Sequence, residues 1–201
     1  LKVRDKLLNR VLAMKVIHGY LFEHESNLQR FVQEAQVCAQ LQHPNILPIY
    51  DIGILDSGPI FITMMEIKGD SLHQRIQAVH AASSHQSWQD TKDGWNLHRL
   101  VSAFHDVCKA VSHAHDNGVV HRDLKPKNIM IGPFGEVLVV DWGLAKVIEA
   151  DELNSSVNTI RSTHDVQATA VGSIYGTPAY IAPELATGEV TTANRLTDIY
   201  A

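Results

Sequence analysis

Three side chains that could transfer a phosphoryl group stand close together in the middle of this sequence. Asp123 and Asn128 belong to the polar stretch HRDLKPKN at residues 121–128, and Asp141 follows thirteen positions after Asn128. In such a set, one carboxylate accepts a proton from a hydroxyl, while an amide and a second carboxylate supply the hard oxygen ligands that Mg²⁺ prefers. These residue types therefore predict a phosphoryl-transfer site.

The segment between the two acidic motifs predicts a β-hairpin. Two runs of branched apolar residues, at 129–131 and 137–140, flank the turn-forming sequence Gly-Pro-Phe-Gly at 132–135. A hairpin brings its two ends together, so we expect Asp141 to lie beside the loop that carries Asp123.

At these residues the sequence resembles the catalytic domain of serine/threonine protein kinases, of the bacterial Hanks type. HRDLKPKN is followed in the family's order by Asp-x-Gly at 141–143, by Gly-Thr-Pro at 176–178 and by Ala-Pro-Glu at 182–184. Because several separate motifs agree in type and order, the resemblance is specific, and it covers essentially all of residues 1–201.

The resemblance implies an α+β, bilobal protein-kinase-like fold that is incomplete at both ends. We expect residues 1–66 to form a partial N-lobe, an antiparallel sheet with one helix, and residues 67–201 a partial, mainly helical C-lobe. Leu1 falls within the family's second strand, so the glycine-rich loop that covers the phosphates is expected upstream of it.

At the other end of the chain, Asp198 matches the aspartate that braces the catalytic loop from the start of the family's long buried helix. Glu184 would lack its arginine partner and is expected to be a buried, unpaired charge. We therefore expect this segment alone to be weakly active or inactive.

The resemblance also implies a role for each residue of the catalytic loop. Asp123 corresponds to the catalytic base, and Lys125 to the lysine that contacts the γ-phosphate of ATP. Asn128 and Asp141 correspond to the ligands of Mg²⁺. Thr177 would approach Asp123 and Lys125, and the pair Lys125 and Thr177 is typical of serine/threonine rather than tyrosine specificity.

Upstream, residues 11–17 predict a strand whose period of two places Ala13 and Lys15 on one face. Glu34 belongs to a predicted helix, with a capping box at 26–29. The apolar residues of this helix keep helical spacing: Leu28, Phe31, Val32, Ala35 and Cys38. Taken alone, Lys15 and Glu34 are ordinary solvated charges. In the resemblance, Ala13 lies against the adenine, Lys15 binds the α- and β-phosphates, and Glu34 pairs with Lys15.

Two further strands are predicted at 46–52 and 60–65. The second leads into the connection between the lobes. The resemblance places Met64 behind the adenine and makes the backbone from Met65 to Ile67 its hydrogen-bonding edge. Core filling is an equally good explanation of the two methionine side chains.

The larger lobe shows two further features. Residues 80–94 are polar and read as an insertion between helices, to which we assign no function. Residues 97–117 keep helical spacing and end at Asn117-Gly118. Since His113 and His115 are two positions apart on this helix, they point to different faces, which argues against a zinc site.

The activation segment, from Asp141 to Glu184, is long and rich in serine and threonine. Thr169 and Ser173 have the spacing of bacterial phosphorylation sites, and Arg122 is the residue that would pair with the phosphate. Five other positions stay open: Ser155, Ser156, Thr159, Ser162 and Thr163. A flexible polar loop without modification is the alternative.

One residue departs from the family pattern. Trp142 stands where the family usually has phenylalanine, between the metal ligand Asp141 and Gly143. We expect catalysis to tolerate this change. A flipped, inactive arrangement of the segment is in doubt, because an indole is harder to relocate.

Composition limits the partners. The 201 residues carry a formal charge of −5 and are 45% hydrophobic, and no basic patch suggests a nucleic-acid surface. No apolar run approaches the roughly 20 residues of a membrane helix, so we expect no membrane contact by this segment and a cytoplasmic location, although the parent protein could be anchored elsewhere. Both cysteines, Cys38 and Cys108, are expected to be reduced and buried.

The predicted function is therefore transfer of phosphate from ATP, with Mg²⁺, to serine and threonine hydroxyls of proteins. Autophosphorylation of the activation segment, within a kinase–kinase dimer, is part of this expectation. A pseudokinase or scaffold is the alternative, although Lys15, Asp123, Asn128 and Asp141 are all present. A small-molecule phosphotransferase of the aminoglycoside type would lack Lys125 and the later motifs, and a pure interaction module would bind partners without turnover of ATP.

Overall fold

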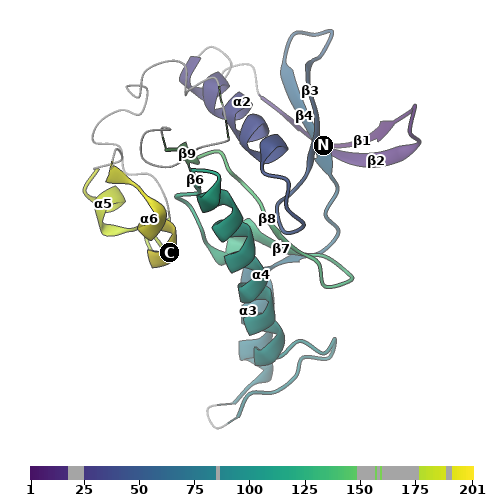
Figure 1. Ribbon diagram of the computed structural model, residues 1–201. Coiled ribbons are helices and arrows are strands. Elements are labelled where there is room, and N and C mark those ends of the chain that lie inside the picture. The colour runs from purple at the N-terminus through teal and green to yellow at the C-terminus, as the bar shows by residue number, and fades with distance from the viewer. Residues whose placement is uncertain (18–24, 85–86, 149–156, 158, 160–176, 189–191) are drawn as a thin grey trace.

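The structure, a computed structural model, describes residues 1–17, 25–84, 87–148, 157, 159, 177–188 and 192–201. Within this part of the chain, antiparallel sheets and helices form an α+β fold, as expected. Figure 1 shows the largest sheet and helix α2 at one end of the molecule and the helix pair α3 and α4 at the other. The predicted catalytic loop lies between these two ends.

The largest sheet has four antiparallel strands in the order β1-β2-β4-β3. Their bounds are Lys2–Asp5 for β1, Arg10–Val16 for β2, Ile49–Ile54 for β3 and Ile60–Met65 for β4. In the register of β2 with β4, Ala13 faces Met64 and Lys15 faces Ile62. Because directly paired residues point to the same side of a sheet, these four side chains share one face.

Two strand predictions agree with the structure to within a residue, and the third does not. The strand predicted at 46–52 begins only at Ile49, and Ile46 makes an isolated bridge to Val139 instead. Pro48 explains the late start, since it lacks the N–H that a ladder requires.

Helix α2, Glu25–Gln40, covers the sheet face that carries Lys15. Phe31 and Ala35 pack with Ile62 of β4, and Met64 packs against the same cluster. The capping box predicted at 26–29 is wrong, because the helix already begins at Glu25. Apolar spacing defines the body of a helix but leaves its first turn undetermined.

The remaining helices and strands surround a second core. Their bounds are β5 Asp70–Ser71, α3 Leu72–Ala82, α4 Leu97–Asp116, β6 Val119–Val120, the 3₁₀ helix η1 Pro126–Asn128, β7 Ile129–Ile131, β8 Val137–Val139, β9 Lys146–Val147, α5 Pro183–Ala186 and α6 Arg195–Tyr200. The predicted hairpin is confirmed as β7 and β8. The helix predicted at 97–117 is confirmed as α4, which Asn96 caps and after which Gly118 has a φ of 73°. Because α3 continues to Ala82, the polar insertion begins later than predicted.

The loop between α2 and β3 is fastened to the hairpin. The Asn45 side chain donates to the carbonyl of Val137 at 2.9 Å, and the Asn45 carbonyl accepts from Val139 at 2.8 Å. The helix that carries Glu34 is thereby tied to the strand that leads to Asp141.

The two cysteines differ from each other. Both are free thiols, and Cys38 is buried as expected, whereas Cys108 is exposed. Helical spacing misplaced Cys108 because it lies beside the apolar stripe of α4 rather than within it. Burial raises the pKa of the Cys38 thiol well above its ordinary value.

Among the described helices, none combines the length and the apolar character that crossing a bilayer requires.

The contact between α2 and the sheet should dominate local stability. Ile62 is fully buried there, so Ile62→Ala is expected to lower the free energy of unfolding by about 2–5 kcal/mol. Ile54→Ala, at a position that is 70% exposed, is the control and should cost about 0.5 kcal/mol or less. Chemical denaturation measures both, and equal losses would contradict this packing.

Candidate active site

The chain enters the site through β6 and turns into the loop that holds Asp123. The Lys125 ammonium lies between two partners, donating to Asp123 Oδ2 at 2.5 Å and to Thr177 Oγ1 at 2.8 Å. Thr177 is 52 positions further along the chain, so this contact fastens the end of the activation segment to the catalytic loop.

The second oxygen of Asp123 is different. Oδ1 is buried, and no donor among the described residues reaches it. A buried carboxylate oxygen without a partner costs free energy, and such an atom is available to accept the hydrogen bond of a hydroxyl group that enters the site.

Asn128 and Asp141 lie together as the hairpin predicts. The Asn128 amide nitrogen donates to the Asp123 carbonyl at 2.9 Å and to its Oδ2 at 3.1 Å, so the amide oxygen is left for another ligand. The backbone N–H of Val140 donates to the Asn128 carbonyl at 2.9 Å, which places Asp141 next to it. The Asp141 side chain is exposed.

This donor set fits Mg²⁺. Mg²⁺ is commonly bound by one or two protein oxygens together with phosphate oxygens and water, and Asn128 and Asp141 offer one amide and one carboxylate oxygen. Within the described ranges, no group of three or more His, Cys, Asp or Glu side chains gathers as a metal site. The pair would therefore hold the ion jointly with a phosphate group rather than alone.

Lys15 and Glu34 form an ion pair across the sheet face. Lys15 Nζ lies 2.9 Å from Oε1 and 2.6 Å from Oε2 of Glu34. Burial raises the pKa of Glu34, while the charge of Lys15 acts in the opposite direction and Asp141 adds to the increase. Since the net shift of the Glu34 pKa is upward, the effect of desolvation outweighs that of the ion pair. The ionised form of Glu34 therefore lowers the stability of the fold.

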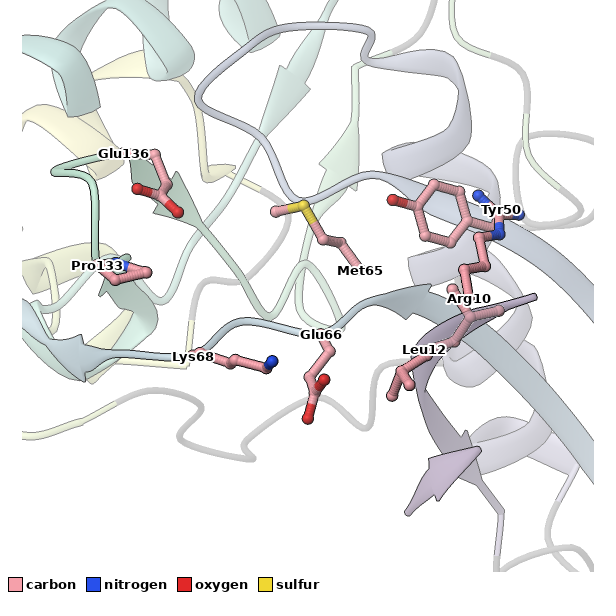
Figure 2. A pocket seen from close by; sticks show the side chains of 9 residues that line it. Arg10, Leu12, Tyr50, Met65, Glu66, Lys68, Pro133 and Glu136 are labelled. Atoms are coloured by element: carbon pink, nitrogen blue, oxygen red, sulfur yellow. The ribbon is translucent and has the colours of Figure 1, made fainter. Parts of the chain in front are cut away.

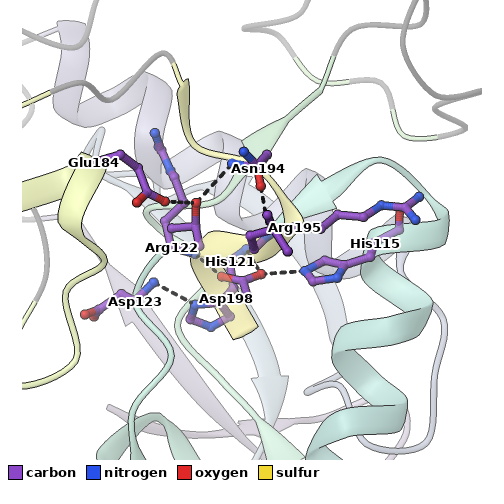
Figure 3. Close-up of polar contacts among 10 residues, drawn as sticks. His115, His121, Arg122, Asp123, Glu184, Asn194, Arg195 and Asp198 are labelled. Carbon is purple, nitrogen blue, oxygen red and sulfur yellow. Dashed lines mark hydrogen bonds and ion pairs between the residues drawn. The ribbon is translucent and has the colours of Figure 1, made fainter. Parts of the chain in front are cut away.

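The catalytic loop is held from below by Asp198, the first-turn aspartate of α6. Oδ2 accepts from the backbone N–H of His121 at 2.8 Å, and Oδ1 accepts from that of Arg122 at 2.8 Å. The ring Nε2 of His115 lies 2.8 Å from Oδ2 (Figure 3). Asp198 is only 6% exposed, so these contacts replace the water that the carboxylate has lost.

Backbone strain shows why this support matters. Arg122 has a φ of 68° and Asp141 a φ of 65°, in the left-handed region that costs an L-residue with a side chain roughly 1–2 kcal/mol. Such conformations persist where surrounding contacts impose them. The bond from Arg122 to Asp198 does so for the catalytic loop.

His121 fixes the loop from inside. Its Nδ1 accepts from the backbone N–H of Asp123 at 3.2 Å, and its Nε2 donates to the carbonyl of Val140 at 3.2 Å. Complete burial lowers the pKa of His121, in agreement with a neutral ring that both accepts and donates. The indole of Trp142 packs against this ring, with centroids 4.6 Å apart.

Trp142 occupies the position that differs from the family pattern. It is 1% exposed and belongs to the same core cluster as Val37 of α2 and Leu41, which directly follows this helix. Its indole nitrogen has no hydrogen-bond partner among the described residues. The side chain is therefore packed firmly but with one unsatisfied donor.

Glu184 is not the buried, unpaired charge that the sequence suggested. It is only partly buried, and its Oε1 accepts from the Thr197 hydroxyl at 2.5 Å (Figure 3). Thr197 in turn accepts from the N–H of Asn194 at 3.0 Å. The N-terminal turn of α6 thus supplies a partner for Glu184, whereas the family resemblance leads one to expect an arginine in this role.

The residues predicted for adenine binding lie at the end of β4. Met64 packs toward α2, and Ala13 is its partner on β2. In the described part of the chain, no hydrogen bond is formed by the backbone N–H or C=O of Ile67. These groups are free to bind the edge of a base, whereas the backbone N–H of Met65 donates to Pro48 at 3.3 Å.

A cavity of about 420 Å³ lies elsewhere. Figure 2 shows it against the connection after β4, bordered by Arg10, Leu12, Tyr50, Met65 and Glu136. None of Ala13, Lys15, Asp123 or Asp141 lines it. Because Leu12 pairs with Met65 on the face opposite to Ala13 and Met64, this cavity is separate from the candidate site.

Sequence reasoning missed two contributors. From the sequence, His115 stands out only as a candidate metal ligand, although its position four residues after the buried Val111 indicates the inner face of α4. Gln33, beside Glu34, donates to the carbonyl of Ala145, and no sequence signal marked it. The predicted phosphorylation sites Thr169 and Ser173 lie outside the described residues.

Comparison with known proteins gives a consistent result. A family model described as protein kinase domain matches residues 1–201. The serine/threonine-protein kinase PknD of Protochlamydia amoebophila is 40% identical and that of Chlamydia caviae 37% identical, each match covering 98% of this chain. The chain spans about a fifth of the length of these curated relatives, 20% and 21% respectively.

Replacing Asp198 should weaken the fold. In Asp198→Asn one carboxylate oxygen becomes an NH₂ group, so at least one of the three buried donors loses its acceptor. We expect a loss of about 2–4 kcal/mol in the free energy of unfolding. Asp106→Asn, which removes an exposed pair with Lys109, should change it by about 0.5 kcal/mol or less. Denaturant titration of both variants would contradict this account if their losses were equal.

Glu34→Gln, unlike Asp198→Asn, should not lower the free energy of unfolding at neutral pH. A carboxyl whose folded pKa is raised stabilises the fold most when protonated, and this contribution is lost as pH rises through the folded pKa. The variant is therefore expected to be at least as stable as the wild type at pH 7, and the difference should shrink as pH falls toward the ordinary range of glutamate.

The control for this prediction is Glu66→Gln. The hydrogen bond from Lys2 lowers the pKa of the partly buried Glu66, so that its contribution to stability is present at neutral pH and lost on acidification. Thermal unfolding as a function of pH distinguishes the two variants. Destabilisation by Glu34→Gln at pH 7 would show that the ion pair outweighs burial.

Proposed function

This chain belongs to the protein kinase domain family, and on that premise we propose that the protein transfers the γ-phosphoryl group of ATP to serine and threonine hydroxyls of proteins. The observation that carries the proposal is the placement of Lys125 between Asp123 and Thr177. It brings together a base, a cation for the transferred phosphate and the end of the segment along which a substrate would lie.

Asp123 acts on the incoming hydroxyl. Its free Oδ1 accepts the hydrogen bond of the substrate serine or threonine and then the proton, while the hydroxyl oxygen forms a bond to the γ-phosphorus. The bond from this phosphorus to the bridging oxygen of ATP breaks, and ADP leaves. The transition state of phosphoryl transfer is loose, so orienting the hydroxyl is the larger part of this role.

Lys125 offsets negative charge on the transferred group. Its bond to Thr177 keeps the ammonium directed toward the substrate segment, and its bond to Asp123 holds the base at a fixed distance. A charged hydrogen bond of this kind is stronger than a neutral one. The combination of Lys125 with Thr177 supports serine and threonine as acceptors.

ATP and Mg²⁺ would be held by the residues around this centre. Lys15, oriented by Glu34, would bind the α- and β-phosphates, and the backbone of Ile67 would bind the adenine that Ala13 covers. Asn128 and Asp141 would hold Mg²⁺, which neutralises charge on the phosphates when it is bound. The paired arrangement of Lys15 and Glu34 at 2.6 Å supports this assignment.

Other parts of the proposal rest mainly on the sequence. We propose the division into lobes at 1–66 and 67–201, autophosphorylation at Thr169 or Ser173 with Arg122 as the phosphate's partner, and a kinase–kinase dimer in which it occurs. Dependence on ATP favours a cytoplasmic location for this domain. The end of the four-stranded sheet at Met65 supports the boundary between the lobes.

The test is transfer of radiolabelled phosphate from ATP by the full-length protein, with Mg²⁺ and a generic basic protein as acceptor. Asp123→Asn should lower the rate roughly 100- to 10,000-fold, since it removes a proton acceptor and keeps the shape of the side chain. Asp116→Asn, at the exposed end of α4, is the matched control and should retain the wild-type rate.

Phosphoamino-acid analysis of the product checks the acceptor class. Label on serine and threonine supports the proposal, and label on tyrosine contradicts it. A wild-type protein that binds ATP without transferring phosphate would instead favour the scaffold alternative.

A further inference from the structure

Gln33 is a buried side chain that the mechanism above does not use. It stands on α2 directly before Glu34 and is only 5% exposed. Its amide nitrogen donates to the carbonyl of Ala145 at 3.1 Å, across 112 positions of sequence. Ala145 is 2% exposed, so this bond supplies a donor to the carbonyl of a buried residue.

The acceptor belongs to a tight turn that follows the metal-binding aspartate. The N–H of Ala145 donates to the carbonyl of Trp142 at 2.9 Å, which closes a turn immediately after Asp141. The turn runs alongside Glu34, since a Cβ placed on Gly143 would lie 3.4 Å from Glu34 Oε2. The position of this turn therefore sets the position of the Asp141 carboxylate.

In the part of the chain that the structure describes, two side chains from different elements hold the turn. Arg122 of the catalytic loop donates through Nε to the carbonyl of Leu144 at 2.5 Å. Gln33 holds the neighbouring carbonyl, that of Ala145, from α2. The turn is thus fixed to the catalytic loop on one side and to α2 on the other.

We propose that Gln33 is a positioning residue that couples the metal-binding Asp141 to the helix that orients Lys15. The inference rests on the proposed function, because it assigns to Asp141 the role of Mg²⁺ ligand. Adjacent residues of α2 then control two parts of the site: Glu34 holds the phosphate-binding lysine, and Gln33 holds the turn that carries the metal ligand. A displacement of α2 would disturb both together.

The consequence of losing Gln33 follows from the strain at Asp141. Its φ of 65° is imposed by its surroundings, and removal of one of the two anchors lets the turn relax toward ordinary backbone angles. The Asp141 carboxylate then moves relative to Asn128. Binding of Mg²⁺ by this pair together with a phosphate group should weaken about tenfold, the effect of losing one buried hydrogen bond.

Two substitutions separate this role from simple packing. Gln33→Met keeps the length and volume of the side chain, and Gln33→Leu keeps an apolar side chain at this position, but neither can donate a hydrogen bond to Ala145. Gln40→Met is the matched control on the same helix. The Gln40 side chain is exposed, and its amide donates within α2 to the carbonyl of Gln36 at 2.9 Å.

The experiment measures binding rather than catalysis. Calorimetry on the full-length protein gives the dissociation constant of a non-hydrolysable ATP analogue, once with Mg²⁺ and once with a chelator. The ratio of the two constants is the Mg²⁺ enhancement. We expect both Gln33 variants to keep the chelator value within about twofold and to lose about tenfold in the Mg²⁺ enhancement, while Gln40→Met matches the wild type.

A wild-type Mg²⁺ enhancement in either folded Gln33 variant would overturn the inference. So would equal weakening with and without Mg²⁺, or unfolding of both variants under conditions where Gln40→Met is folded, because Gln33 would then serve general stability. Failure of the proposed function has another signature: the wild-type protein itself would bind the analogue without any Mg²⁺ enhancement or would not bind it.

Discussion

The site depends on one buried carboxylate. Asp198 accepts the backbone N–H groups of His121 and Arg122 and contacts the ring of His115, and it thereby holds Arg122 in a left-handed conformation that the residue would not adopt alone. The loop that follows brings Asp123 and Lys125 into place. Several hydrogen bonds hold this buried carboxylate in place, and the loop that it supports carries Asp123.

Hydrogen bonds between separate elements link the loop held by Asp198 to the rest of the site. Arg122 reaches the turn after Asp141, that turn contacts α2 through Gln33, and α2 holds Lys15 through Glu34. Two of these groups are in costly surroundings. Burial raises the pKa of Glu34, and one oxygen of Asp123 has no partner among the described residues. Such costs are typical of functional sites, where side chains are arranged for chemistry and not for stability.

Local pattern and spacing were sufficient to predict much of this arrangement. The hairpin β7–β8, the shared face of Ala13 and Lys15, and helix α4 all follow from periodicity and turn residues. The first turn of α2 and the exposure of Cys108 did not, because each depends on how a neighbouring element packs, whereas the late start of β3 follows from the local signal of Pro48. The bonds of Gln33 to Ala145, Glu184 to Thr197 and His115 to Asp198 join residues far apart in sequence, and no periodicity encodes such pairs.

The fold itself, through Asp198, fixes the catalytic loop before any nucleotide binds. Amide hydrogen exchange at His121 and Arg122 in the nucleotide-free protein tests it most directly. The account predicts that both amides exchange as slowly as those in the buried stretch of α4, because they are released only by unfolding. Fast exchange that slows only when a nucleotide is added would show that the ligand, and not Asp198, orders the loop.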